Sequence, residues 1–520
     1  MDRLKMIEKV RNNSKGYDFI VIGGGATGIG VALEACARGY SVLLLEKSDF
    51  TKSTSSKSTK LVHGGVRYLA QGDFGLVREA LVERGWLVQF APHLVKNQAF
   101  IIPTAKWYDE IRYTVGLTFY DLLAGKLSLG RSKRISKSKT LSRISTINPK
   151  KLSAGVVYYD GQFDDTRLAI NTLQTAEELG AVVLNYCTVT GLLKDKEGNV
   201  SGVRFFDKEV NKQYEIKGKQ VVNATGVFAD DVLLMDSPNS EKTIAPSQGV
   251  HLVLDKSFLP GEDAIMIPKT DDGRVLFLVP WHNRVIVGTT DTPIEQETLE
   301  PIALHDEIDF ILRTASRYLT KAPKKSDVLS VFAGLRPLAF SKEVGKKTKE
   351  ISRSHKIIES KSGLLTIVGG KWTTYRKMGE DLVDKTELKN GWKHIETKTK
   401  HLKIHGYKEN VDYNNPLYFY GSDEKGVLEL AKEDGMGDFI SKSLGVINAQ
   451  VVWAAKYEMA RTVEDFLARR TRCQLLDAKE SIKMAPKVAA LMAVELGEDE
   501  AWQIEQIKNY EKVTLNYILN

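Results

Sequence analysis

A glycine-rich turn between two apolar segments constrains the fold of this chain more than any other feature. Tyr17–Ile22 is typical of a buried strand, Gly23–Gly28 has the spacing G-x-G-x-x-G, and Ala26–Arg38 has the apolar spacing of a helix. A second apolar strand, Ser41–Leu45, follows. Strands that are joined through a helix lie parallel in one sheet. The sequence therefore predicts a βαβ unit at the start of an α/β domain.

The glycines of this turn are typical of a dinucleotide site. Gly23 permits a tight turn, Gly25 lets backbone amides approach a diphosphate, and Gly28 allows the helix and the strand to pack closely. The start of the helix supplies positive potential for the phosphates. Glu46 ends the second strand, where its carboxylate can accept hydrogen bonds from ribose hydroxyls and would repel a 2′-phosphate. The pattern predicts a bound dinucleotide and disfavours NADP.

Two later glycine clusters help to decide between FAD and NAD. A motif this close to the N-terminus fits proteins in which distant chain segments complete a flavin site. Asn223–Gly226 and Gly369–Lys371 fit such returns, and a helix that starts after Lys371 can stabilise negative charge on a reduced flavin. Each cluster alone could be an ordinary turn between a strand and a helix. Together they favour FAD.

Composition excludes several other classes. The 520 residues suggest about three domains, and with 42% apolar and 27% charged residues the chain is neither disordered nor fibrous. A net charge of +8 is a mild bias toward an anionic substrate or surface. Three cysteines far apart argue against a disulfide framework and fit a reducing compartment. No apolar run is long enough for a transmembrane helix. The sequence contains neither an HExxH motif nor a CxxC pair, and we therefore predict no metal site.

The rest of the chain divides by pattern. We expect residues 1–16 to be a frayed helix or a tail. Residues 245–340 alternate as strands do, and the segment beyond about 395 is mostly helical. Between them, apolar and aromatic residues from Val115 lead into Lys126–Arg143, a run with seven lysines or arginines and no acid.

Several further motifs occur in one consistent order along the chain. They are STSSKSTKLVHGGVRYLA at Ser53–Ala70, followed by VNATG, GTTD, GLRPL and GGKWTTYR. With GGGATG before them, they make the chain from about Tyr17 to Met378 resemble the FAD-dependent glycerol-3-phosphate dehydrogenases, the respiratory family that reduces quinone. The resemblance implies an FAD-binding Rossmann-type domain interleaved with an α+β substrate domain built on an antiparallel sheet, and a C-terminal helical domain.

The resemblance also implies domain boundaries and site residues. We expect residues 17–92, 150–235 and 350–388 to form the FAD-binding domain, residues 93–149 and 236–349 the substrate domain, and residues 389–520 the helical domain. The expected cofactor contacts are Gly23, Gly25, Ala26, Thr27, Gly28, Glu46, Lys47, Thr54, Ser55, Ser56, Ser58, Lys60, Leu61, His63, Val189, Ala224, Thr225, Gly226, Gly370, Lys371 and Thr373. The expected substrate contacts are Arg67, Tyr68, Arg353 and Thr373.

The implied substrate, sn-glycerol 3-phosphate, needs two kinds of group. Its phosphate favours guanidinium groups, which bind bidentately and stay charged, and we assign this role to Arg67 and Arg353. Oxidation at C2 removes a hydride and the hydroxyl proton. His251 is the expected general base, and Arg336 and Lys371 are expected to stabilise the developing alkoxide.

Simpler interpretations exist for each of these residues. An arginine is commonly a surface ion-pair partner, His251 in an apolar strand could be a core histidine, and Arg336 before a proline could belong to a turn. The consistent order of the motifs favours the functional interpretation.

The implied partners are a quinone and a membrane surface. Val115–Arg143 combines apolar residues with cations, which suits peripheral attachment to anionic lipid, although a solvated basic loop fits equally. We expect a cytoplasmic protein at the inner face of the cell membrane. A homodimer is left open.

Other functions remain as alternatives. A glycerophosphate oxidase would carry out the same half-reaction with O2 as acceptor and H2O2 as product. An amine or amino-acid oxidase fits less well, because several cations around the site favour a phosphate. A non-catalytic FAD-binding scaffold or a nucleic-acid partner has only the basic run in its favour, without the interleaved aromatic residues of a strand-binding groove.

Overall fold

The apolar segments on either side of the glycine turn form the centre of the first sheet. In a computed structural model, which describes residues 1–70, 72–271, 273–339 and 354–519, β1 (Tyr17–Ile22) pairs in parallel with β2 (Val42–Leu45). On its other side β1 pairs in parallel with the end of β10 (Lys212–Asn223), so a strand from much later in the chain joins the two N-terminal strands in one sheet. Burial on both faces is typical of parallel sheets and accounts for the uninterrupted apolar runs.

Further strands complete this sheet. Its main path is β17-β18-β10-β1-β2-β7, and β8 and β9 extend it as an antiparallel ribbon with the start of β10. Their bounds are β7 Val182–Leu184, β8 Cys187–Lys194, β9 Val200–Asp207, β17 His355–Glu359 and β18 Leu365–Gly369. Three long helices share the same apolar core, α2 (Ala26–Ala37), α7 (Asp165–Glu178) and α10 (Tyr375–Asn390).

The N-terminal segment is helical, one of the two forms expected from the sequence, but it is packed against the domain and not frayed. Residues Arg3–Asn12 form helix α1, whose Met6, Ile7 and Val10 side chains are buried. The buried guanidinium of Arg3 donates to the Asp207 carboxylate at 2.8 Å. The apolar face of this helix is short and lies among charged residues, which is why its docking was missed.

A second sheet is antiparallel apart from one parallel contact, between β4 and β12. Its path is β15-β11-β14-β13-β12-β4-β6-β3, with β16 beside β11 and β5 beside β6. The bounds are β3 Leu61–Val62, β4 Val95–Thr104, β5 Lys133–Ser136, β6 Ala154–Phe163, β11 Ile244–Asp255, β12 Ala264–Ile267, β13 Leu276–Trp281, β14 Arg284–Gly288, β15 Thr292–Pro293 and β16 Val328–Ala339. The domain boundaries stay a prediction, and β6 lies in this sheet although we assigned its residues to the first domain.

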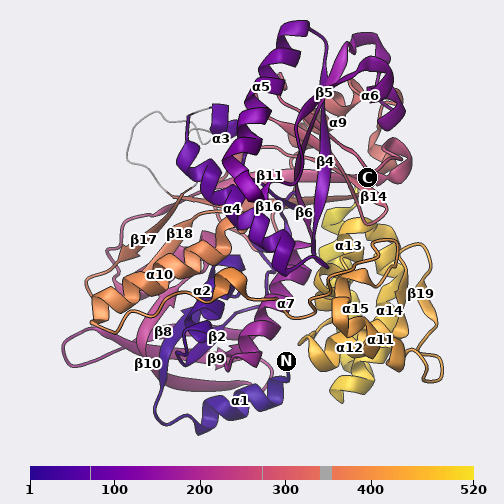
Figure 1. Cartoon of the computed structure of the whole chain (residues 1–520). Helices are drawn as coiled ribbons and strands as arrows, with labels where there is room; N and C mark the ends of the chain where they lie inside the picture. Colours follow the sequence, from indigo (N-terminus) through magenta and orange to yellow (C-terminus); the bar gives the residue numbers. More distant parts are fainter. Residues whose placement is uncertain (71, 272, 340–353, 520) are drawn as a thin grey trace.

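Helices cover the second sheet and extend beyond it. Helix α9 (His305–Ser316) buries Ile308 and Ile311 in the apolar cluster that also contains Val250 and Leu252 of β11. Helix α5 lies at the end of the molecule opposite α1 (Figure 1). The other helices before the C-terminal region are α3 Val66–Ala70, α4 Phe74–Phe90, α5 Trp107–Ala124, α6 Lys137–Arg143 and α8 Ala229–Asp236.

The C-terminal region forms a helical domain beside the first sheet (Figure 1). Its helices are α11 Glu424–Leu430, α12 Asn448–Tyr457, α13 Cys473–Leu476, α14 Ala478–Leu496 and α15 Glu500–Thr514, with a π-helical turn at Asp465–Arg470 and a small ribbon of β19 (Phe439–Ser441) and β20 (Val446–Ile447). It has its own apolar core, in which Phe466, Met484 and Val488 are buried.

Helices α2 and α10 cross so closely that side chains are excluded at the crossing. A Cβ atom at Gly379 would lie 2.3 Å from the carbonyl oxygen of Gly30, and one at Gly30 would lie 2.4 Å from that of Tyr375. Because backbone atoms lie on both sides, neither contact can be relieved by a rotamer change.

We predict that Gly379→Ala lowers the free energy of unfolding by about 1–3 kcal/mol, the usual effect of overpacking a core. Gly116→Ala, in α5 with no atom within 4 Å of its added Cβ, is the matched control. It should leave stability unchanged or raise it by up to about 1 kcal/mol, because alanine favours helix. Thermal unfolding of both variants measures this, and equal melting temperatures would contradict the prediction.

Candidate cofactor and substrate site

A cavity of about 530 Å³ lies between the two sheets. Segments from both sheets line it: the turn after β1, the end of β2, the loop of residues 51–59, β11, β16 and the turn after β18. Most of the expected cofactor contacts are in its wall. These are Gly23, Gly25, Ala26, Thr27, Glu46, Lys47, Thr54, Ser55, Ser58, Leu61, His63, Val189, Ala224, Thr225, Gly226, Gly370, Lys371 and Thr373.

The glycine turn brings the start of α2 to the cavity. Gly23 has φ +110°, in the left-handed region that favours glycine, and a Cβ at Gly28 would lie 2.0 Å from the Gly23 carbonyl oxygen. Gly25 is the N-cap of α2, and the Ala26 amide donates to the Ser55 hydroxyl at 3.0 Å. Gly28 thus packs α2 against the turn and does not itself line the cavity.

Glu46 closes the turn from the second strand. Its carboxylate accepts from the backbone amides of Gly24 at 2.7 Å and Ser48 at 2.9 Å. Burial raises its pKa, and these two amides act in the opposite direction. The remaining lone pairs can accept hydrogen bonds from ribose hydroxyls.

The loop between β2 and β3 separates residues that line the cavity from residues that support them. Lys60 is fully buried, where its ammonium lies 2.6 Å from Asp165 and donates to the Ser56 carbonyl at 2.7 Å. Neither Lys60 nor Ser56 is in the cavity wall. The sequence predicts both as cofactor contacts, whereas in the structure their side chains support the loop. Thr54 is fixed by donating to the Leu335 carbonyl at 2.6 Å.

His251 lies at the cavity on β11. Its ring stacks on Phe332 with centroids 4.9 Å apart, and its Nε2 is 2.9 Å from the Thr59 hydroxyl. Its buried Nδ1 has no hydrogen-bond partner among the described residues. Burial, reinforced by the charge of Arg336, holds the pKa of His251 well below its usual value of 6.5. The imidazole is therefore neutral near neutral pH and able to accept a proton.

Arg336 reaches the cavity from β16, which pairs with β11. Its guanidinium donates to the Thr290 carbonyl at 2.9 Å and the Thr289 hydroxyl at 3.1 Å, and lies 3.4 Å from Asp291. It passes over Gly249, where a Cβ would lie 2.3 Å from Nη2. These contacts fix the orientation of the cation.

Lys371 and Tyr68 meet on another wall of the cavity. The Lys371 ammonium lies 4.1 Å from the centroid of the Tyr68 ring, in cation–π geometry. Beside them, the Thr373 hydroxyl accepts from the backbone amide of His63 at 3.1 Å. The structure thus brings together four residues that the sequence expected at the site.

Two expected phosphate ligands are not placed by the structure. Arg353 lies outside the described residues, and of Arg67 only the backbone, in α3, is described. Their roles remain predictions.

Sequence reasoning missed several other groups in the cavity wall. Cations reach it at Lys52, Lys57 and Arg274, and Asp291 also lines it. Nothing in the sequence indicated that Arg274 would lie at the cavity. The cations suit a negatively charged ligand.

One group of potential metal ligands lies elsewhere. Asp384, Glu387 and His394 bring ligand atoms within 4.8 Å of one another. However, the Arg38 guanidinium lies 2.7 Å from Asp384 and 3.0 Å from Glu387. Both carboxylates thus already have a cationic partner in Arg38, and the cluster is accounted for as an ion-pair network.

The residues present fit FAD. The start of α2 offers amides for a diphosphate, and Glu46 offers a carboxylate for ribose hydroxyls. Beyond the glycine turn the cavity continues to β11 and β16, which leaves space for the flavin ring of FAD. Fold and site together are those of an FAD-dependent oxidoreductase.

Comparisons with known proteins agree with this assignment and point to a narrower family within the FAD-dependent oxidoreductases. Residues 18–376 match the family model for FAD dependent oxidoreductases, and residues 364–503 match that for the C-terminal domain of alpha-glycerophosphate oxidase. The chain is 38% identical to the mitochondrial glycerol-3-phosphate dehydrogenase of Schizosaccharomyces pombe, over 96% of this chain and 87% of that protein. It is 37% identical to the human mitochondrial enzyme, over 96% and 73%.

A solved structure shows the same architecture. The glycerol-3-phosphate dehydrogenase of Bacillus halodurans, complexed with FAD, superposes with a TM-score of 0.80 at 28% identity, covering 99% of this chain and 98% of that one. The chain belongs to the family of FAD-dependent glycerol-3-phosphate dehydrogenases. The predicted fold class and the predicted cofactor, FAD, are both confirmed.

Proposed function

We propose that the chain oxidises sn-glycerol 3-phosphate to dihydroxyacetone phosphate and that the electrons pass through FAD to a membrane quinone. The observation that carries this proposal is one continuous cavity that joins the glycine turn to His251, Arg336 and Lys371. The names of relatives matched along 96% of the chain support the substrate.

In this proposal the chain's residues divide the work of oxidation. Arg336 and Lys371, with Arg274, supply fixed positive charge for the phosphate and for the oxygen at C2 as its proton leaves. His251 accepts that proton, because its imidazole is neutral and buried beside the cavity. Bound FAD supplies the acceptor for the hydride from C2. Arg67, Tyr68, Arg353 and Thr373 are proposed to complete the substrate contacts.

The glycerophosphate oxidase activity remains the second candidate, because residues 364–503 match the C-terminal domain of an alpha-glycerophosphate oxidase. The two functions share the substrate half-reaction and differ in the electron acceptor.

Anaerobic titration of the purified holoenzyme with sn-glycerol 3-phosphate tests the first half-reaction. We expect the absorbance of oxidised flavin to bleach with one equivalent of substrate per flavin, and glycerol to have no effect. A quinone analogue should then restore the colour faster than air does. Faster recovery in air with release of H2O2 would favour the oxidase, and no bleaching would contradict both.

The role of His251 predicts a specific pH profile. His251→Asn should lower kcat/KM by about 10²–10⁴-fold without loss of bound flavin, since general base catalysis contributes about this much. Because the pKa of His251 lies well below 6.5, the wild-type imidazole stays unprotonated down to mildly acidic pH. We therefore expect kcat/KM not to fall between about pH 8 and about pH 6.5. A fall in the wild-type kcat/KM centred near the usual histidine pKa would contradict this. The control is His305→Asn, at an exposed histidine, which should keep the wild-type kcat/KM.

The structure adds support for attachment to a membrane surface. Helix α5 exposes apolar residues on successive turns, from Trp107, which is 70% exposed, through Ile111 and Val115 to Leu122, which is 71% exposed. The cations of β5 and α6 lie at the same end of the molecule (Figure 1). The apolar face thus begins eight residues before the segment that the sequence indicated. No helix in the described ranges is long and apolar enough to cross a bilayer.

We propose that this end of the molecule rests on anionic lipid at the inner face of the cell membrane. Reversing Lys133, Lys137 and Lys139 to Glu should weaken binding to phosphatidylglycerol vesicles by about 100-fold or more, since each cation near such a surface contributes about 1 kcal/mol. The matched control reverses three exposed lysines of the C-terminal helices, Lys479, Lys487 and Lys508. Equal vesicle binding in a sedimentation assay by both variants would contradict the proposal.

A further inference from the structure

Much of the cavity wall is a single loop whose outer side is held by the C-terminal domain. We call residues 47–59 the cavity loop; most of its residues from 51 onward line the cavity. It has little regular structure, apart from a 3₁₀ turn at Thr54–Ser56. Its shape therefore depends on the side-chain contacts that it makes, and several of these reach more than 400 residues along the chain.

The first contact is made by Asp49, which is fully buried. Its carboxylate accepts from Arg469 Nε at 2.5 Å and from two nitrogens of Arg470, at 2.7 and 3.0 Å. Asn185 donates to it from the first domain at 3.2 Å. Burial disfavours the charge of Asp49, but the two guanidinium groups outweigh this and lower its pKa to about 2.

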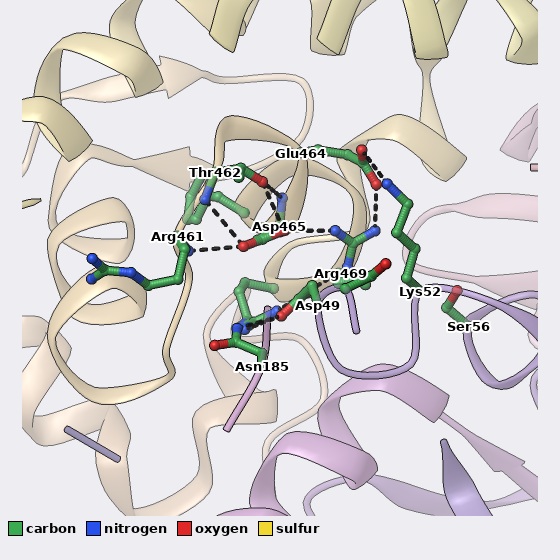
Figure 2. Close-up of polar contacts among 12 residues, drawn as sticks. Asp49, Lys52, Ser56, Asn185, Arg461, Thr462, Glu464, Asp465 and Arg469 are labelled. Atoms are coloured by element: carbon green, nitrogen blue, oxygen red, sulfur yellow. Dashed lines mark hydrogen bonds and ion pairs between the residues drawn. The ribbon is translucent and has the colours of Figure 1, made fainter. Parts of the chain in front are cut away.

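Neighbouring charges extend this contact into a cluster (Figure 2). The Lys52 ammonium lies 2.8 Å from Glu464, and Arg469 contacts Glu464 and Asp465, each at 2.8 Å. Lys52 itself is in the cavity wall. The three carboxylates of Asp49, Glu464 and Asp465 face the three cations of Lys52, Arg469 and Arg470. Removing one arginine therefore leaves an uncompensated charge next to the loop.

The end of the chain makes a second contact with the cavity loop. Lys57, which lines the cavity, donates to the hydroxyl of Tyr517, and that hydroxyl donates to Glu300 at 2.7 Å. The C-terminal domain therefore contacts the loop at Asp49, Lys52 and Lys57, on both sides of the 3₁₀ turn.

Backbone hydrogen bonds connect Asp49 to the glycine turn. The amide of Thr51, two residues beyond Asp49, donates to the Gly24 carbonyl at 3.0 Å. Further along, the Ser55 hydroxyl accepts from the Ala26 amide at the start of α2. A shift of Asp49 is thus passed on to the part of the site that faces the diphosphate.

We propose that Arg469 and Arg470 are positioning residues of the FAD site: by binding Asp49 they fix the cavity loop, so that FAD affinity depends on the C-terminal domain. If the contact between the C-terminal domain and the cavity loop served stability alone, apolar side chains could make it, because buried ion pairs are seldom more stabilising than well-packed apolar groups. Their directional hydrogen bonds instead fix where Asp49 lies. The inference needs FAD as cofactor and does not depend on the substrate or the electron acceptor proposed above.

FAD binding to the apoprotein of the full chain tests this directly. We expect Arg470→Gln to raise the dissociation constant of FAD about tenfold or more, and Arg470→Lys, which keeps the charge, to recover part of the affinity. Titration followed by flavin fluorescence measures both, and the absorbance and circular dichroism of bound flavin should change with the affinity. These readouts do not require turnover.

Two control variants separate positioning from loss of stability. Arg461→Gln removes an interdomain ion pair with Glu209, at 2.9 Å, close in sequence to Arg469 but away from the cavity loop. Tyr510→Phe removes a hydrogen bond to Ser481, at 2.7 Å, inside the C-terminal domain. Both should keep wild-type FAD affinity even where the melting temperature falls.

Three outcomes would overturn the proposal. One is wild-type affinity in Arg470→Gln. Another is an equal loss of affinity in Arg461→Gln or Tyr510→Phe, which would show that any weakening of the C-terminal domain suffices. If Arg470→Gln does not fold, the FAD affinity of Arg470→Lys tests the proposal instead. Wild-type affinity with an unchanged flavin spectrum in that variant would then refute the role.

Discussion

The architecture depends on close backbone approach along one helix, α2. At its start, Gly28 packs against the Gly23 carbonyl, which keeps the first turn of the helix at the cavity. Half a turn later Gly30 meets α10, whose own Gly379 faces the Gly30 carbonyl. Because α10 follows directly on Lys371 and Thr373, the same helix contact also sets the opposite wall of the cavity. Side chains at these glycines would separate elements that must meet.

Charge is distributed unevenly between the surface of the cavity and its support. Buried ion pairs such as Lys60 with Asp165, and Asp49 with two arginines, lie behind the loop and are fully compensated. Of the cations in the cavity wall, Lys371 contacts the Tyr68 ring, and Arg336 donates to a hydroxyl and a carbonyl and also lies 3.4 Å from the Asp291 carboxylate. The ion pairs behind the loop support its position, and the lysines and arginines of the wall suit an anionic ligand.

The sequence predicted those parts of the structure that depend on local pattern or on motif order. The strand–turn–helix start and the two later glycine clusters follow from residues close together in the chain. The resemblance carried by the motif order predicted His251 and Arg336 at the site, and both line the cavity. Contacts across long separations left no such signal. Lys60 lies in the same motif as residues that line the cavity, yet it pairs with Asp165. Arg274 lines the cavity although it belongs to none of the recognised motifs. The amphipathic character of α1 was too weak to reveal its docking.

The order in which the polypeptide leaves the ribosome determines when one of these long-range contacts can form. Asp49 and Arg470 are separated by 421 positions, so their carboxylate–guanidinium pair cannot form until the C-terminal domain has been synthesised as far as Arg470. β1 and β2 can pair early, and β18 completes the parallel part of that sheet when about 370 residues have emerged. If the cavity loop is positioned as proposed, the segment that faces the diphosphate reaches its final shape only after Arg470 has been synthesised, and flavin capture follows the synthesis of the C-terminal domain.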